Sequence, residues 1–360
     1  MFNQINNVII PYISGLWTLP WILIGFILTI ILGKLMGRGQ IDKLMKKIGL
    51  MILFFFVPVL IFRIFLNTSF GAEEIEFSII VISIIALMYM IAFIYAKYSI
   101  DKFGLTGQRK NLYYKTILTN QGRSSAFIGS MMLGVEAWRV PAAINMALVG
   151  IALFAAIPAY LSYLHRKENK NKKNVKNVKA LPWFLKLYPW YLIIFVLLGI
   201  IVQKSTYQTS SELLGYEANT ILTLYTAITI PAALYYVGAG IHPNDLKKVE
   251  LKKLIGLDKK GEKGDHWSWV RHIFLMTVII TPLITAIIFI PLYMLGFILA
   301  PWFVVIIINS FLPITSTNMF LIPYGIDKKS TAHVVTWTTL VCVPIVVALI
   351  IFFGSISTFL

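Results

Sequence analysis

The sequence has little charge for its length: 13% of its 360 residues are charged, whereas 58% are hydrophobic. Such a composition cannot cover a water-soluble domain with polar side chains, so it excludes the soluble classes. A single cysteine, Cys342, excludes a disulfide framework and a thiolate metal site. The chain also lacks HExxH, paired catalytic aspartates and a Ser/His/Asp set at one depth. We therefore expect no enzyme, no metal and no cofactor.

Long apolar segments are what the sequence has in abundance. A membrane core about 30 Å thick needs about 20 apolar residues in a helix, and ten segments have that length. In order, these spans are 17–36, 44–66, 77–97, 111–135, 138–163, 182–203, 219–241, 268–292, 296–324 and 331–354. The sequence therefore predicts an all-α polytopic protein with ten transmembrane helices in a lipid bilayer.

The formal net charge of +17 reports orientation rather than a nucleic-acid partner. Of the 32 Lys and Arg residues, 28 lie in or beside alternate loops, whereas the opposite loops hold acidic and polar residues. The positive-inside rule makes the basic loops cytoplasmic. We expect a multi-pass protein of the plasma (cell inner) membrane with both termini extracytoplasmic.

A basic cytoplasmic linker at 164–181 divides the chain into 1–163 and 182–360, with five spans each. Because five is odd, the second half enters the membrane from the opposite side, so similarity between the halves would be an inverted repeat. The second span of each half contains a proline, Pro58 or Pro231, which is expected to kink the helix.

Polar, helix-breaking sequence interrupts the fourth span of each half. Such sequence at mid-depth is tolerated only where it faces protein or a water-filled cavity, and two equivalent breaks indicate a transporter's substrate site. The alternatives are a simple kink at the proline and helix packing by the Ser and Thr residues. The candidate substrate-binding residues are Asn120, Gln121, Gly122, Arg123, Ser124 and Ser125 in span 4, and Asn309, Pro313, Thr315, Ser316 and Asn318 in span 9.

Arg123 is a cation at mid-depth, where none of the fifteen acidic residues is expected. An unpaired arginine there costs at least about 2.5–3.5 kcal/mol, so a substrate carboxylate is a candidate partner. The alternatives are backbone carbonyls freed at the break, or a water-filled crevice. A proton relay would lack its central carboxylate, and sodium would have to use neutral oxygens. Arg63, near the outer end of span 2, is interpreted as a snorkelling side chain.

Several short motifs in order carry a resemblance to a known family. They are Val57-Pro58-Val59-Leu60-Ile61-Phe62, Ala126-Phe127-Ile128-Gly129, Pro231-Ala232-Ala233-Leu234 before Gly238-Ala239-Gly240, Phe311-Leu312-Pro313 with Asn318, and Tyr324-Gly325-Ile326-Asp327. With these motifs the chain resembles the auxin efflux carrier family, which includes the plant PIN exporters. The family is related in architecture to the bile acid:sodium symporters.

The resemblance implies two inverted five-helix repeats whose broken helices, spans 4 and 9, cross. Spans 1, 2, 6 and 7 would form a scaffold, and spans 3–5 and 8–10 a transport domain that moves against it in an elevator mechanism. The two breaks would bound the substrate site. The chain departs from the family at Gly122-Arg123-Ser124, where proline or asparagine is common.

These features predict a secondary active or potential-driven transporter of small organic anions such as carboxylates. Sodium-coupled uptake is the alternative within transport, with Asn120, Gln121, Asn309 and Asn318 as candidate oxygen ligands. A non-transporting membrane receptor is the alternative of another class. The substrate, the direction of transport and formation of a homodimer stay open.

Overall fold

The structure is a computed structural model that describes residues 20–67, 71–125, 128–169, 183–241, 243, 247–256, 266–315, 318, 321–322 and 324–357. These residues are nearly all helical and contain no β-strand. Residues 170–181 of the predicted linker lie outside them, as does Ser316 of the candidate site.

Most helices coincide with the predicted spans. In the first half they are α3 (Pro20–Met36), α4 (Arg38–Met51), α5 (Val57–Leu66), α6 (Ala72–Phe103), α7 (Gly107–Thr119), α8 (Arg139–Ile151) and α9 (Ile157–Asn169). In the second half they are α10 (Trp183–Thr206), α11 (Ser210–Ala227), α12 (Thr229–Ala239), α13 (Lys248–Ile255), α14 (His266–Leu275), α15 (Thr281–Met294), α16 (Ala300–Ser310) and α17 (Lys328–Ser357).

Five of the helical segments are long and apolar enough to cross a membrane: Gly39–Leu66, Ala72–Phe103, Ser210–Ala239, His266–Met294 and Lys328–Ile356. Shorter apolar helices cover Pro20–Met36, Ile193–Thr206 and Ala300–Ser310. The prediction of an all-α membrane protein with transmembrane helices is confirmed at this level. The count of ten spans and the side on which the termini lie stay predictions.

Each of three spans contains one wide π-helical turn. An α-helix with proline as its second residue follows each turn directly. The turns are Ile52–Phe56, Ala152–Ala156 and Met276–Ile280, and the prolines are Pro58, Pro158 and Pro282. A proline lacks the N–H of a normal helical bond and its ring clashes with the carbonyl four residues earlier. A π turn widens the helix there, so the chain continues across the membrane. In span 7 a single residue, Ile228, separates α11 from α12 shortly before Pro231, and its backbone stays in the right-handed helical region.

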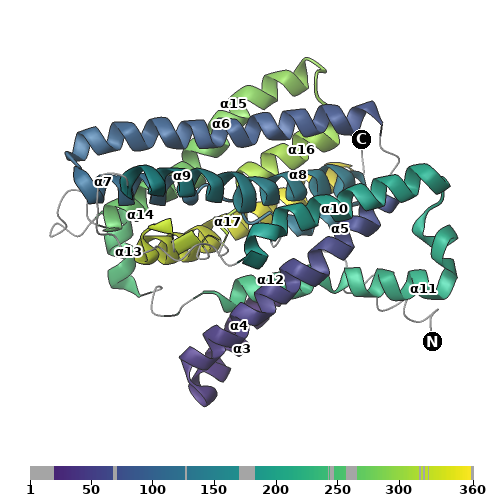
Figure 1. Ribbon diagram of the computed structural model, residues 1–360, viewed down its shortest axis with the longest axis horizontal. Helices are drawn as coiled ribbons and strands as arrows, with labels where there is room; N and C mark the ends of the chain where they lie inside the picture. Colours follow the sequence, from purple (N-terminus) through teal and green to yellow (C-terminus); the bar gives the residue numbers. More distant parts are fainter. Residues whose placement is uncertain are drawn as a thin grey trace.

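Two packed helix pairs form one part of the fold; α3, α4 and α12 lie in the lower part of Figure 1, and α5 and α10 lie at mid-height on the right. Helix α3 packs against α12, and α5 packs against α10. Glycines permit the close approach, because a Cβ at Gly25 would overlap the backbone of Tyr235 and one at Gly238 would overlap the backbone of Ile22. A Cβ at Gly199 would lie 2.9 Å from the carbonyl oxygen of Phe62. Small residues thus set these helix–helix contacts.

The other part contains α6 to α9 and α14 to α17; α6 and α15 lie at the top of Figure 1, and α14 and α17 lie at mid-height. Helix α6 contacts α7 and α8, α14 contacts α17, and α16 contacts α15 and α17. One buried apolar cluster extends from α5 and α12 through α8 to α16, so the two parts share a core. A second cluster, which includes Tyr113, Trp269 and Trp337, joins α7, α14 and α17.

The α3–α12 contact gives a first prediction. Gly238→Ala should destabilise the protein by about 1–3 kcal/mol or more, because the added methyl overlaps backbone that cannot move aside cheaply. Thermal unfolding in detergent measures this. Gly39→Ala is the matched control, because nothing lies within 4 Å of its Cβ position; an equal loss in both variants would contradict the packing account.

Candidate functional site

The two interrupted spans meet at one point. Arg123 and Ile314 form an isolated antiparallel bridge. The Ser124 N–H donates to the Pro313 carbonyl at 2.8 Å, and the Thr315 N–H donates to the Gly122 carbonyl at 3.0 Å. Backbone groups that left their helices therefore satisfy each other, which a membrane interior requires. The structure brings together the breaks that the sequence predicts in spans 4 and 9.

Neighbouring helices hold this crossing by polar contacts. The Ile314 N–H donates to Thr338 Oγ1 of α17 at 3.2 Å. Asn120 Nδ2 donates to Thr331 Oγ1 of the same helix at 3.1 Å, and Ser125 Oγ donates to Asn145 Oδ1 of α8 at 3.2 Å. Spans 5 and 10 thus position the breaks of spans 4 and 9. The sequence reasoning missed Asn145, Thr331 and Thr338, which look like ordinary helix-packing residues.

Gly122 has little free space around it. A Cβ there would lie 2.7 Å from both Asn318 Oδ1 and Leu153 Cδ1. Gly122 therefore lets Asn318, from beyond the span 9 break, approach the span 4 backbone. This contact connects a third predicted span 9 residue to the crossing, beside Pro313 and Thr315.

The Arg123 side chain is buried, with 4% of it exposed. Its Nη1 donates to the Leu312 carbonyl at a long 3.4 Å, whereas Nε and Nη2 have no hydrogen-bond partner among the described residues. Nε and Nη2 lie on one edge of the guanidinium and form the fork that can bind a carboxylate by two parallel hydrogen bonds. Among the residues that the structure describes, no carboxylate pairs with this fork.

Two helix C-termini help to explain how a cation is buried here. Helix α7 ends at Thr119 and α16 ends at Ser310, one on each side of the crossing. Each terminus carries roughly half a negative charge, which favours the guanidinium. After the span 4 break, the described chain does not resume at once as an α-helix. The described residues there form only a short 3-10 helix, Gly129–Gly134.

Within the described ranges, four buried amide side chains at the crossing have oxygens without hydrogen-bond partners. These oxygens are Asn120 Oδ1, Gln121 Oε1, Asn309 Oδ1 and Asn318 Oδ1. Three of the amide nitrogens donate to backbone carbonyls of their own helices: Asn120 to Thr116, Gln121 to Ile117 and Asn309 to Val305. The crossing therefore combines a cationic donor fork with neutral acceptors.

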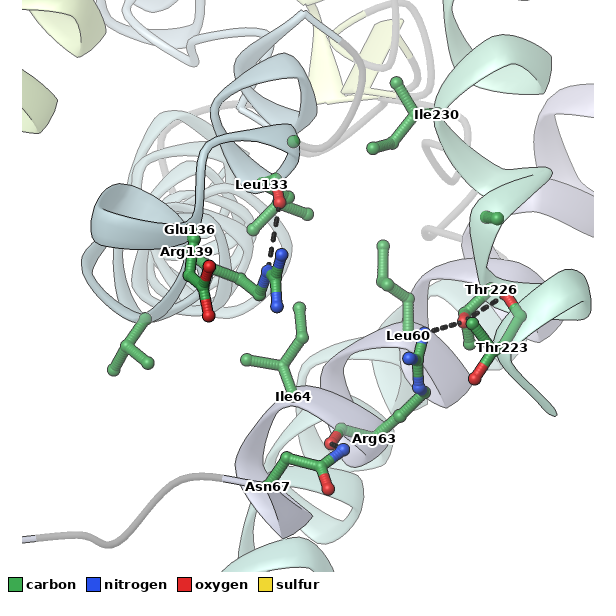
Figure 2. A pocket seen from close by; sticks show the side chains of 13 residues that line it. Leu60, Arg63, Ile64, Asn67, Leu133, Glu136, Arg139, Thr223, Thr226 and Ile230 are labelled. Atoms are coloured by element: carbon green, nitrogen blue, oxygen red, sulfur yellow. Dashed lines mark hydrogen bonds between the residues drawn. The ribbon is translucent and has the colours of Figure 1, made fainter. Parts of the chain in front are cut away.

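A cavity of about 350 Å³ lies between α5, α11–α12 and the segment from η4 (Gly129–Gly134) to α8. Figure 2 shows Arg63 and Arg139 reaching it from opposite walls. Arg63 Nη1 donates to Thr226 Oγ1 at 2.7 Å, and Arg139 Nε donates to the Leu133 carbonyl at 3.2 Å. Arg63 is half-buried and bonded to Thr226 of α11, and its interpretation as a snorkelling side chain stays a prediction.

The charge distribution contained a signal for this cavity that sequence reasoning did not use. Only four of the 32 Lys and Arg residues fall outside the predicted cytoplasmic loops and their flanks: Arg63, Arg123, Arg139 and Lys204. One of the three arginines lies at the crossing and two line the cavity. Cations placed against the orientation rule therefore indicate the polar interior of this protein.

The described residues contain no group of three or more His, Cys, Asp or Glu that could hold a metal ion. No protein-family model matches the chain, and a search of curated proteins finds no matching relative.

The role of Thr338 gives a second prediction. Thr338→Val should destabilise the protein by about 1–3 kcal/mol, because it leaves the buried Ile314 N–H without its acceptor while keeping the side-chain volume. Thr338→Ser, which keeps the hydroxyl, should lose clearly less. Thermal unfolding of the two variants compares them, and a loss in Thr338→Val no larger than the loss in Thr338→Ser would contradict the role given to the hydrogen bond.

Proposed function

We propose that the protein is a membrane transporter of small organic anions, carboxylates above all, and that substrate binds at the crossing of spans 4 and 9. The observation that carries this proposal is the buried Arg123 fork, Nε and Nη2, which has no hydrogen-bond partner in the part of the chain that the structure describes. A substrate carboxylate would supply two charge-assisted hydrogen bonds and neutralise the cation. Bending of the crossing segments would give the anion access to it.

The contacts between spans support the inverted-repeat architecture. Spans 1 and 7 meet through α3 and α12, and their counterparts five places away, spans 6 and 2, meet through α10 and α5. In the same way, spans 3 and 4 meet through α6 and α7, and spans 8 and 9 meet through α15 and α16. The bridge between Arg123 and Ile314 joins spans 4 and 9, so the exchange leaves it unchanged. Such a pattern is expected of two repeats of five spans related by a twofold axis in the membrane plane. It also supports the resemblance to auxin efflux carriers.

The same contacts support a division into a scaffold of spans 1, 2, 6 and 7 and a transport domain of spans 3–5 and 8–10. In this proposal the second group carries the crossing and its bound anion past the first, as an elevator. An anion leaving an inside-negative cell gains about 2.3 kcal/mol per charge for every 100 mV. Efflux therefore needs no coupling ion.

Sodium-coupled uptake is a second candidate, favoured by the four unpartnered amide oxygens at the crossing. Neutral oxygens are suitable ligands for a hard cation such as sodium, and the nearby C-termini of α7 and α16 add partial negative charge. A bound sodium ion would also share the site with the carboxylate, so the two ions would favour each other's binding. A receptor that binds the same anion without moving it is the alternative outside transport, and flux separates the two.

The Arg123 proposal predicts a specific loss of transport. In proteoliposomes, Arg123→Gln should lower counterflow of a labelled carboxylate by about 10- to 100-fold, the effect of losing one charge-assisted pair. Lys110→Gln in the first turn of α7 is the control, because it removes the same charge from an exposed position. Unchanged counterflow in folded Arg123→Gln would refute the charge-pairing role.

The two coupling modes predict different responses to sodium. If the membrane potential drives the anion, replacing sodium by a large organic cation should leave flux unchanged, and an inside-negative potential should speed efflux. If flux instead stops without sodium, the coupled mode is correct. In that case Asn318→Ala should raise the sodium concentration required for half-maximal flux, because it removes a buried candidate ligand.

A further inference from the structure

The cavity between α5, α11–α12 and α8 has features of a built anion site, separate from the crossing. Arg63 is fixed in one orientation, because Thr226 accepts from its Nη1 while the Thr226 hydroxyl is directed at the carbonyls of Leu222 and Thr223. Arg63 Nε is buried and has no hydrogen-bond partner. A preorganised guanidinium with a spare donor is suited to a carboxylate.

The second arginine adds charge without an ion pair. The Arg139 Nε–H donates to the Leu133 carbonyl, and the positive charge of Arg139 repels that of Arg63. Glu136 also lines the cavity, yet no ion pair joins it to either arginine among the described residues. Two positive charges and one negative charge leave a net lining charge of +1, since no other lining residue is charged. One bound negative charge would neutralise the cavity.

The rest of the lining is largely apolar. Leu60, Ile64, Leu133 and Ile230 face the same space as the two guanidinium groups. Burial of an apolar group against such side chains contributes about 25 cal/mol for each Å² removed from water. The cavity therefore has one end for a carboxylate and walls for a hydrocarbon or aromatic body, and its volume of about 350 Å³ is ample for a single ring.

We propose that this cavity binds amphipathic monocarboxylates, with Arg63 holding the carboxylate and Arg139 attracting it from the mouth. Arg139 is exposed and Arg63 half-buried, which gives the two residues these different roles. That the cavity lies on the path of a transported anion rests on the proposed function. Arg63 and Arg139 lie at the ends of spans that the predicted topology puts on the extracytoplasmic side, so the anion occupies the cavity there, before or after the crossing.

Binding of labelled benzoate to the full-length protein in nanodiscs tests this proposal. Arg63→Gln should weaken benzoate binding by about 10- to 100-fold, since it removes a charge-assisted pair. Arg139→Gln should weaken it less, and Lys204→Gln should not weaken it, because Lys204 is an exposed cation at the end of α10 outside the cavity. Arg63→Lys keeps the charge and should give an intermediate loss, which guards against a folding defect in Arg63→Gln.

Two competitors test the ligand class. Benzamide, which has the ring without the charge, should not displace benzoate, and malonate should displace it only weakly, because its second charge has no partner in a lining of net charge +1. Benzoate binding that is equally strong in folded Arg63→Gln would overturn the proposal. Stronger binding of malonate than of benzoate would overturn the assignment to monocarboxylates.

Flux measured beside binding separates this inference from the transport proposal. If benzoate binds through Arg63 but does not cross the membrane, the cavity is a binding site and the transport proposal fails. If benzoate crosses and Arg63→Gln leaves both its binding and its flux unchanged, transport holds and the cavity proposal fails.

Discussion

The structure depends on one constraint: backbone N–H and C=O groups that leave a helix inside a membrane must find partners within the protein. Two spans break at the same point, and each supplies the partners that the other lacks, through the Ser124–Pro313 and Thr315–Gly122 hydrogen bonds. Thr338 supplies the acceptor for the Ile314 N–H that the pairing leaves over. The other features of the crossing follow, because extended backbone at this depth opens space between helix ends where polar side chains can be buried.

Burial of Arg123 is the second consequence. The guanidinium lies near the C-terminal ends of α7 and α16, whose partial negative charges offset part of its desolvation cost. Its remaining donors form a fork that a carboxylate fits. Arg63 shows a related arrangement nearer the protein surface, with one donor used by Thr226 and another free of protein partners. Both sites are cationic in a chain whose other cations, apart from Lys204, lie in or beside predicted cytoplasmic loops.

Much of the fold could be predicted from the sequence, because membrane spans leave strong signals in hydropathy and in proline and glycine placement. The helices follow the expected spans, and the breaks at Gly122–Ser125 and near Pro313 meet as expected. The partners of the crossing could not be predicted: Thr331, Thr338 and Asn145 act through three-dimensional proximity, which no local pattern reports. The bond from Arg63 to Thr226 could not be predicted either, because a cation near a helix end looks the same in sequence with or without such a partner. Ser316 lies outside the described residues, so its predicted role stays a prediction.

The central claim is that a carboxylate pairs with Arg123 and crosses the membrane as a net charge. Electrical recording from proteoliposomes adsorbed on a solid-supported membrane tests it most directly. A benzoate concentration jump should give a current with the sign of moving negative charge, a benzamide jump should give none, and Arg123→Gln should abolish the benzoate current. A benzoate current of the same size in folded Arg123→Gln protein would contradict the account.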